Sequence, residues 1–120
     1  MNNKPKTLFI DIDGVLFHHC GSGNAQAKLK KPALLPGVLN KFDEWDRKGY
    51  RLILVTGRHE SVRVATERQL FEAGIVYDQL IMGLGGGNRV VINDFKPNST
   101  IPTAEAICLE RNKGLEAVNV

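Results

Sequence analysis

Two aspartates separated by one residue, Asp11 and Asp13, are the first side chains in this sequence whose spacing could support catalysis. They stand at the end of a short apolar run, residues 7–12, which is typical of a buried strand. Alternate residues of a strand point the same way, so both carboxylates can approach one pocket if the chain turns after Ile12, and Gly14 permits such a turn. A carboxylate can attack phosphorus to give an aspartyl-phosphate, and a second carboxyl group can protonate the leaving alkoxide and then activate water. We therefore expect Asp11 to be a nucleophile and Asp13 a general acid and base.

A second polar cluster, formed by Thr56, Gly57 and Arg58, follows the apolar run at residues 51–55. Because ligands of open parallel sheets bind beyond the carboxyl ends of the strands, this cluster should lie beside the two aspartates. We expect the Thr56 hydroxyl and the backbone amides of Gly57 and Arg58, near a helix N-terminus, to hold phosphate oxygens. The Arg58 side chain could contact the substrate or cap the next helix, and the sequence does not decide between these roles.

A third polar cluster, Asn93 and Asp94, follows a further apolar run at residues 89–92. With Asp11 and Asp94 ionised beside a phosphate dianion, about four negative charges would meet. One like-charge pair about 4 Å apart costs on the order of 4 kcal/mol at an effective dielectric constant of 20, so a cation must compensate. Mg²⁺ prefers one or two carboxylates, several waters and a phosphate oxygen. We therefore predict Mg²⁺ as the cofactor, with Asp11, Asp94 and the backbone carbonyl of Asp13 as its protein ligands.

The elements that would position these clusters alternate between strand and helix along the chain. Strands are predicted at residues 7–12, 51–55, 79–82 and 89–92, helices at 36–48, 61–73 and 103–113, and an edge strand at 116–120. Short connections between such elements indicate the α/β class: a Rossmann-like, three-layer α/β/α domain whose mostly parallel sheet is covered by helices on both faces. Residues 15–35 show no sustained period and are expected to form an irregular flap with one short hairpin. The glycine-rich residues 83–87 are predicted to be a turn that lets Arg89 approach the site.

The composition is that of an ordinary globular domain and excludes several classes of protein. The chain has 120 residues, 42% of them hydrophobic and 24% charged, which allows one domain whose core needs neither disulfide nor metal. Apolar stretches are too short to cross a membrane and no signal peptide is recognisable. We therefore expect a cytoplasmic protein without a membrane partner, in which Cys20 and Cys108 are reduced thiols.

The formal net charge of +3 is too small to indicate a nucleic-acid partner, and its distribution is more informative than its size. The basic excess lies in residues 1–50, which carry eight basic and five acidic side chains. Its densest cluster is Lys28, Lys30 and Lys31. A solvated loop is one interpretation of this cluster, and a weak attraction for an anionic substrate or partner is the other.

Three motifs, in this order along the chain, resemble those of the haloacid dehalogenase-like phosphatases. Asp11-Ile12-Asp13-Gly14-Val15, Thr56-Gly57-Arg58 and Ile92-Asn93-Asp94 are similar to the first, second and fourth motifs of that family, over about residues 7–97. Related cation pumps have threonine at the place of Asp13, so the resemblance is to the phosphatases. It implies a Mg²⁺-dependent phosphomonoester hydrolase that acts through an aspartyl-phosphate on a small phosphorylated metabolite such as a sugar phosphate.

The intervals between the motifs leave no room for a cap domain. Between Asp13 and Thr56 lie 42 residues, and between Thr56 and Asp94 lie 37, and each interval is largely used by a helix and a strand. We expect a single, capless, haloacid dehalogenase-like catalytic domain over residues 1–120. Its open site would be covered by the flap at residues 15–35, by a second copy in a homo-oligomer or by a large substrate.

One departure from the family pattern concerns a cation. Family members usually carry a lysine before the fourth motif that bridges the nucleophile and the phosphate, and residues 83–88 contain none. Arg89 is the nearest substitute and Lys96 the next, although a planar guanidinium is not equivalent to an ammonium group. A catalytically degenerate domain that serves as a binding or regulatory module is therefore the alternative to an enzyme, and a phosphotransferase is a third interpretation.

Overall fold

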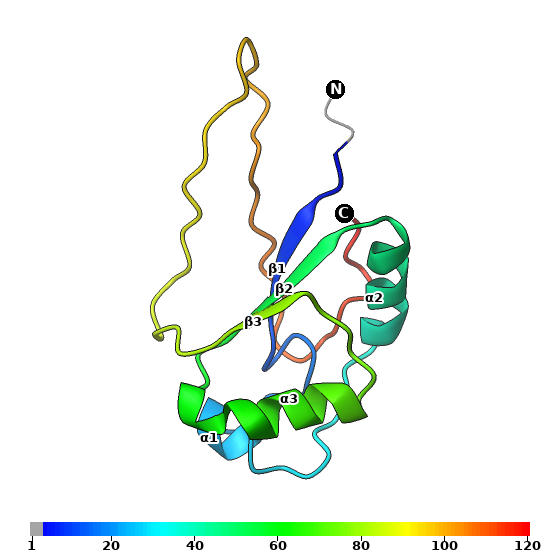
Figure 1. Ribbon diagram of the computed structural model, residues 1–120, viewed down its shortest axis with the longest axis vertical. Helices are drawn as coiled ribbons and strands as arrows, with labels where there is room; N and C mark the ends of the chain where they lie inside the picture. Colours follow the sequence, from blue (N-terminus) through cyan, green and yellow to red (C-terminus); the bar gives the residue numbers. More distant parts are fainter. Residues whose placement is uncertain (1–3) are drawn as a thin grey trace.

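A computed structural model of the chain describes residues 4–120. Its regular elements are, in chain order, β1 (Thr7–Asp11), α1 (Gly23–Gln26), α2 (Val38–Arg47), β2 (Arg51–Val55), the 3-10 helix η1 (Glu60–Val62), α3 (Arg63–Glu72) and β3 (Gln79–Ile81). The three strands form one parallel sheet in the order β1-β2-β3 (Figure 1). The α/β class and the parallel sheet predicted from the sequence are confirmed. In the described part of the chain, no helix has the length and hydrophobicity needed to cross a membrane.

The three strands end at nearly the same level of the sheet. Asp11, the last residue of β1, is level with Val55 of β2, and Val55 is level with Ile81 of β3. Thr56 continues this alignment, because its backbone amide donates to the Ile81 carbonyl at 3.0 Å. Since parallel strands run in one direction, their carboxyl ends share an edge, and the first two predicted clusters lie there together.

One side of the sheet packs against the helices α2 and α3. Alternate strand residues form a core cluster with side chains from both helices: Ile10, Leu52, Leu54 and Leu80 from the strands, and Val38, Phe42, Trp45 and Leu70 from the helices. The three α2 residues recur at helical spacing, as predicted, and so share one face. On the opposite side of the sheet Phe9 and Ile81 stay 60% and 41% exposed. The predicted helix at residues 61–73 is present but divided into η1 and α3.

In the flap, residues 15–35, the structure has the short helix α1 where a hairpin was predicted. Ser22 begins this helix, and its hydroxyl accepts a hydrogen bond from the Ala25 amide at 3.1 Å, which satisfies one of the free amides of the first turn. Isolated bridges join Phe17 to Asp13 and to Leu34. The flap is therefore folded onto the loop that carries the two aspartates.

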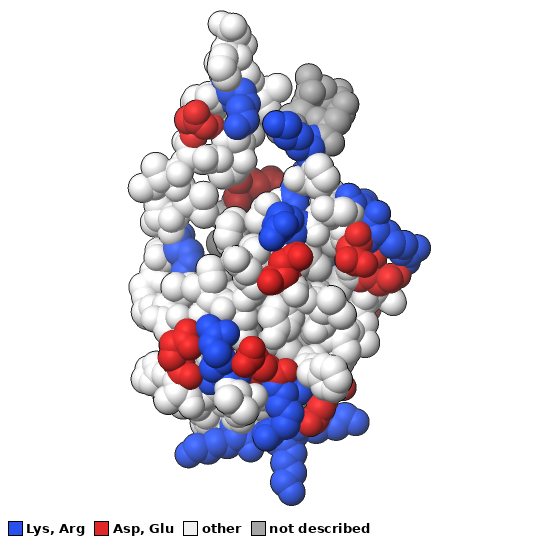
Figure 2. Space-filling view, in the orientation of Figure 1, with Lys and Arg blue, Asp and Glu red and all other residues white. Residues whose placement is uncertain are grey.

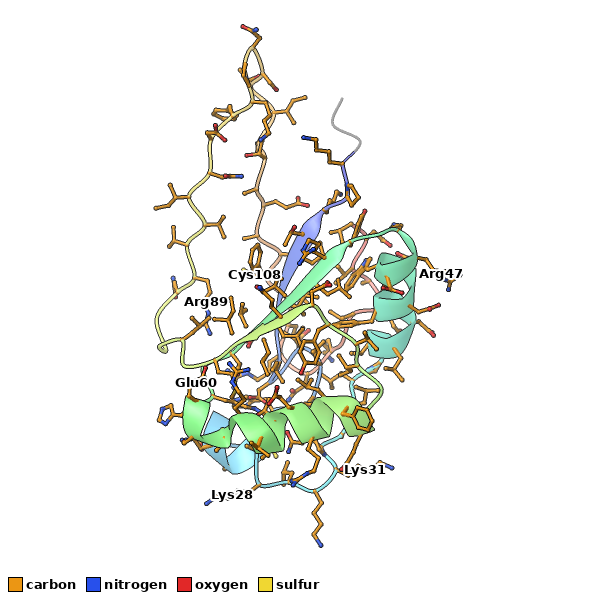
Figure 3. All side chains as sticks on the ribbon, viewed as in Figure 1. Lys28, Lys31, Arg47, Glu60, Arg89 and Cys108 are labelled. Carbon is orange, nitrogen blue, oxygen red and sulfur yellow. The ribbon has the colours of Figure 1, made fainter. Side chains whose placement is uncertain are left out.

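The basic cluster of the flap lies at one end of the molecule. Lys28 and Lys31 project from the end that α1 and α3 form, and they point away from the sheet (Figure 3). Figure 2 shows basic side chains extending from this same end. The two lysines are exposed. Their position favours the interpretation of a solvated loop, because they do not face the ends of the strands.

Residues 85–108, which we call the arm, leave the sheet as a long loop that projects from the body of the molecule and returns to it (Figure 1). The strand predicted at residues 89–92 is not formed. Val90, Val91 and Ile92 are 78%, 63% and 93% exposed, so neither a neighbouring strand nor the core holds them. An apolar run is stabilised as a strand only when it is paired and packed, and this run pairs with no strand in residues 4–120.

Residues 109–120, the C-terminal tail, pack on the body without forming a helix or a strand. Leu115 and Val118 belong to the core cluster, and the Leu115 amide donates to the Pro36 carbonyl at 2.9 Å. The predicted helix at residues 103–113 and the predicted edge strand at 116–120 were therefore wrong. Residues 103–108 are exposed on the arm, so a helix there would have no buried face to stabilise it, and Asn112, whose φ of 67° lies in the left-handed region, would end any helix at that point.

Candidate active site

The carboxyl edge of the sheet brings together five of the predicted site residues: Asp11, Asp13, Thr56, Gly57 and Arg58. Thr56 is buried, and its hydroxyl oxygen accepts a hydrogen bond from the Arg58 amide at 3.1 Å. This amide, which was expected to hold a phosphate oxygen, therefore has a protein acceptor. The Gly57 amide has none among the residues that the structure describes. A Cβ at Gly57 would lie 3.2 Å from the Leu84 carbonyl oxygen, so the close approach at this turn favours glycine.

Arg58 and Asp13 form a two-point ion pair. Arg58 Nε donates to Asp13 Oδ2 at 2.9 Å, and Nη2 donates to Oδ1 at 2.8 Å. The guanidinium side chain is fully buried and the Asp13 side chain is 10% exposed. A buried charge of this kind needs a partner, and the fork of an arginine matches a carboxylate in both distance and plane. Arg58 is thus neither a helix cap nor an open substrate ligand, the two roles that the sequence left undecided.

The helix α3 supplies the other partners of Arg58. Arg58 Nη1 donates to Thr66 Oγ1 at 3.0 Å and to Gln69 Oε1 at 2.7 Å. Both residues are buried, so α3 turns polar groups as well as the apolar Leu70 towards the body. The guanidinium therefore uses four of its five N–H groups on protein acceptors, which fixes its position and that of Asp13.

Gln26 of α1 is a site residue that sequence reasoning missed. It is buried, and its Nε2 donates to the His18 carbonyl at 2.7 Å and to Asp13 Oδ1 at 3.4 Å. Its Oε1 accepts hydrogen bonds from the backbone amide and the thiol of Cys20, at 3.1 and 3.0 Å. No periodicity in the flap marks Gln26, so the sequence contained no signal that could have identified it.

Asp11 has fewer protein contacts than Asp13. Its Oδ1 accepts a hydrogen bond from the Ile12 amide at 2.8 Å. The residue is exposed at the edge of the sheet, yet enough protein surrounds its carboxyl group for partial desolvation to raise the pKa of Asp11 above its ordinary value. The Ile12 amide and then the charge of Arg89 oppose this shift, while the charge of Asp13 adds to it. The predicted nucleophile is thus open to solvent on one side and near both a cation and a second carboxylate.

Arg89 lies at the start of the arm, beside β3 (Figure 3). Its Nη1 donates to the carbonyls of Gly85 and Gly87 at 3.3 and 3.1 Å, and its charge lowers the pKa of Asp11. The glycine turn therefore brings this guanidinium within electrostatic range of the predicted nucleophile. Lys96 is exposed on the arm and has no such effect on Asp11.

Asp94 also lies on the arm, and the structure does not bring it to Asp11 or Asp13. Its carbonyl accepts a hydrogen bond from the Thr103 hydroxyl, and Asn93 Nδ2 donates to the same hydroxyl oxygen at 2.9 Å, so these contacts are made within the arm. Among the described residues there is no group of three or more acidic, histidine or cysteine side chains that could hold a metal ion. The prediction that three strand ends meet was wrong for the third, because residues 89–92 do not pair with the sheet.

The C-terminal tail reaches the aspartate loop through Asn112, a second residue that the sequence did not reveal. The Asn112 amide donates to the Gly14 carbonyl at 2.9 Å. Its side chain accepts from the His19 amide at 2.7 Å and donates to the His19 carbonyl at 3.2 Å. The side chain of Arg111 packs 3.1 Å from the place of a Cβ on Gly14. The turn after Asp13 is therefore held from outside by residues almost a hundred positions away in the sequence.

The donor atoms at the edge fit a minimal Mg²⁺ site. Asp11 offers a carboxylate that bonds only to one backbone amide among the described residues, and the backbone carbonyl of Asp13 accepts no hydrogen bond there. Both are oxygen ligands, which Mg²⁺ prefers, and the ion commonly completes its shell with waters and substrate phosphate oxygens. The Asp13 carboxylate is taken by Arg58, so it is not an available ligand.

Comparison with known proteins supports this fold. No protein-family model matches the chain, and no curated protein matches it. Two structures of the Pnkp1/Rnl/Hen1 complex, one described as an RNA repair complex, contain a chain with 30% and 28% sequence identity over 72% and 71% of this chain, with TM-scores of 0.57 and 0.55. This chain spans only 30% and 28% of the length of those matched chains.

Two further structures are similar at lower identity. A crystal structure from Vibrio cholerae matches 73% of this chain and 79% of its own, with a TM-score of 0.51 and 18% identity, which supports the fold alone. The D,D-heptose 1,7-bisphosphate phosphatase of B. bronchiseptica, solved with magnesium and phosphate, matches 68% of this chain and 51% of its own at 20% identity and a TM-score of 0.45.

A parallel sheet with a D-x-D-G loop after one strand and a T-G-R turn after its neighbour defines an α/β protein of the haloacid dehalogenase-like fold. The structural matches are to proteins of haloacid dehalogenase-like fold, and this chain is similar to them in fold. No cap domain is present among residues 4–120.

Proposed function

We propose that this chain is a Mg²⁺-dependent phosphomonoester hydrolase in which Asp11 attacks phosphorus and Asp13 is the general acid and base. The observation that supports it best is the contrast between two carboxylates on one loop. Asp13 is held by a buried guanidinium, whereas Asp11 Oδ1 bonds only to the Ile12 amide and Oδ2 has no protein donor among the described residues. One carboxylate is fixed for proton transfer, and the other is open to a substrate.

The proposed reaction has two steps. Asp11 Oδ2 forms a bond to phosphorus while the ester P–O bond breaks, and Asp13 gives its proton to the departing alkoxide, so that an aspartyl-phosphate and an alcohol result. Water then attacks phosphorus, Asp13 takes a proton from it, and the bond between phosphorus and Asp11 breaks, which restores both carboxyl groups. The Thr56 hydroxyl, the Gly57 amide and the Arg89 guanidinium would hold the phosphate oxygens during both steps.

Mg²⁺ would be held by Asp11 and the Asp13 carbonyl, whereas Asp94, the third ligand predicted from the sequence, lies on the arm and is not brought to them. When bound, the ion neutralises charge on the phosphoryl group as it is transferred. Arg58 donates to both oxygens of the Asp13 carboxylate, so this carboxylate would not bind the ion and would stay available for proton transfer to the leaving group.

The proposed substrate is a small phosphorylated metabolite such as a sugar phosphate. A phosphorylated end of RNA is a second candidate, favoured by the 30% identity to a chain of the Pnkp1/Rnl/Hen1 complex and by an edge of the sheet without a cap domain, which leaves room for a large substrate. Lys28 and Lys31 point away from the sheet, so these two charges of the flap would not attract RNA toward the site. A second copy of the chain that covers the site remains a further proposal.

An assay of phosphate release distinguishes the proposed hydrolase from the alternative, a catalytically degenerate binding module. The panel contains sugar phosphates, a 3′- and a 5′-phosphorylated oligoribonucleotide and p-nitrophenyl phosphate, each with and without Mg²⁺. We expect Mg²⁺-dependent release by the wild type and none by Asp11→Asn. Release no faster than that of Asp11→Asn would refute the enzyme, and transfer of phosphate to an added alcohol in preference to water would identify a phosphotransferase.

A further inference from the structure

The Asp13 carboxylate receives three hydrogen-bond donors that are distributed unequally over its two oxygens. Oδ1 accepts from Arg58 Nη2 at 2.8 Å and from Gln26 Nε2 at 3.4 Å, while Oδ2 accepts only from Arg58 Nε at 2.9 Å. A carboxylate has about four lone-pair positions, two on each oxygen. Among the described residues, a vacant position therefore remains on Oδ2 and none on Oδ1. The Gln26 bond is the longest of the three.

The orientation of the Gln26 amide is fixed by its other partners. Its Oε1 faces two donors, the amide and the thiol of Cys20, and its Nε2 faces two acceptors, the His18 carbonyl and Asp13 Oδ1. Rotating the amide by half a turn would place donor against donor at Cys20 and acceptor against acceptor at Asp13. The network thus selects one orientation of the amide, and in that orientation the Gln26 NH₂ group donates to Asp13 Oδ1.

We propose that Gln26 is a positioning residue that makes Asp13 exchange its proton through Oδ2, an inference that rests on the proposed hydrolase function. By occupying the second lone pair of Oδ1, Gln26 leaves Oδ2 as the only atom that can carry the proton to the leaving alkoxide. Gln26 contacts no reacting atom. It acts through Asp13, and through it the position of the flap helix α1 would affect proton transfer by Asp13.

The anchoring of α1 does not depend on the Gln26 side chain alone. Asn24 Nδ2 lies 3.1 Å from His59 Nδ1, and its Oδ1 accepts from the His59 amide at 3.3 Å. Gln69 Nε2 donates to the carbonyls of Gln26 and Leu29 at 2.9 and 2.7 Å. Asn24→Ala therefore removes hydrogen bonds between α1 and His59 and leaves the hydrogen bonds of Asp13 intact. It is the matched control for a substitution of Gln26.

The test compares two leaving groups in the 120-residue chain with Mg²⁺. An alkyl phosphate needs protonation of its alkoxide, whereas p-nitrophenolate leaves without it, and kcat/KM reports only steps up to the departure of the alcohol. Gln26→Met keeps the side-chain length and loses the donor. We expect its kcat/KM to fall at least tenfold for the alkyl phosphate and less than threefold for p-nitrophenyl phosphate. We expect Asn24→Ala to lower neither by more than threefold.

Two outcomes would overturn the proposal in an active enzyme. Equal losses of kcat/KM in Gln26→Met for both substrates would show a merely structural role. A loss of the same size in Asn24→Ala, specific to the alkyl phosphate, would assign the effect to α1 as a whole.

If Gln26→Met does not fold, as judged by circular dichroism, Gln26→Asn replaces it, because the shorter amide cannot reach Asp13. If the wild type releases no phosphate above Asp11→Asn, the hydrolase function itself fails. An active wild type with an unchanged ratio refutes the role of Gln26 alone.

Discussion

The guanidinium of Arg58 holds the carboxylate of Asp13 through two hydrogen bonds, at 2.9 and 2.8 Å, inside the protein. Arg58→Met should therefore leave Asp13 and the two polar residues of α3 without their partner, at a cost of about 3 kcal/mol in the free energy of unfolding. Urea unfolding near pH 7 measures this. A loss below about 1 kcal/mol, the range of exposed ion pairs, would contradict it. In the double variant with Asp13→Asn, the two losses should not add, because the pair is already broken by either change.

The same pair shows why part of the site could not be predicted from the sequence. The positions of Asp11 and Thr56 follow from two short apolar runs, which are local patterns, and the structure places them at one edge of the sheet as expected. Arg58 and Asp13, by contrast, are 45 positions apart, and Asn112 and His19 are 93 apart. Nothing in local spacing identifies such partners.

The errors in the second half of the chain have a related cause. Residues 89–92 have the composition of a strand, but a strand also needs a neighbour to pair with, and no local pattern guarantees one. Helix α2 was predicted well because its apolar residues recur at helical spacing. The buried face of α3 includes Thr66 and Gln69, whose role depends on the distant Arg58 and is invisible to hydrophobic periodicity.

The raised pKa of Asp11 predicts a pH-dependent stability. Because folding raises this pKa, the native state binds the proton more tightly than the unfolded chain does. Stability should therefore decrease as the pH rises from the ordinary value of 3.8 through the raised pKa, and it should stay lower above it. Asp11→Asn lacks this penalty. In buffer with EDTA, its melting temperature should exceed that of the wild type near pH 7, and the difference should shrink below the ordinary pKa. Parallel pH profiles of the two proteins would refute the prediction.

Arg89 is predicted to replace the missing lysine, because its charge acts on Asp11 while Lys96 lies farther out on the arm. Arg89→Ala should lower turnover of the phosphate ester at least tenfold, which corresponds to about 1.4 kcal/mol of transition-state stabilisation. Lys96→Ala should lower it less, and serves as the control for loss of a positive charge on the arm. The opposite ranking would assign the role to Lys96.

Asp94 tests whether the arm contributes to the metal site. If Asp94 is a ligand, as the sequence predicts, Asp94→Asn should raise the Mg²⁺ concentration needed for half-maximal activity at least tenfold. The structure instead holds Asp94 on the arm, where its carbonyl accepts a hydrogen bond from the Thr103 hydroxyl, and it does not bring Asp94 to Asp11, so we expect no change. Titration of activity with Mg²⁺ distinguishes the two. Glu105→Gln, also exposed on the arm, controls for the loss of one negative charge.

Glycine is favoured at Gly114 and Gly74 by a left-handed backbone, and at Gly114 also by lack of space for a side chain. Both have a left-handed backbone, with φ of +87° and +79°. A Cβ on Gly74 would meet nothing within 4 Å, whereas a Cβ on Gly114 would lie 2.2 Å from the Pro36 carbonyl oxygen, a backbone atom that cannot move aside. Gly74→Ala should therefore cost only the left-handed strain, about 1–2 kcal/mol.

Gly114→Ala should cost at least about 3 kcal/mol, because the tail must also separate from Pro36. That separation withdraws Asn112 from Gly14 and His19, so the turn after Asp13 loses its outer support. Urea unfolding of both variants measures the difference, and loss of the Asn112 side-chain amide signals by NMR reports the release of the tail. Equal costs for the two substitutions would show that the contact between the tail and Pro36 does not stabilise the fold, and the link from the C-terminus to the aspartate loop would then have no energetic basis.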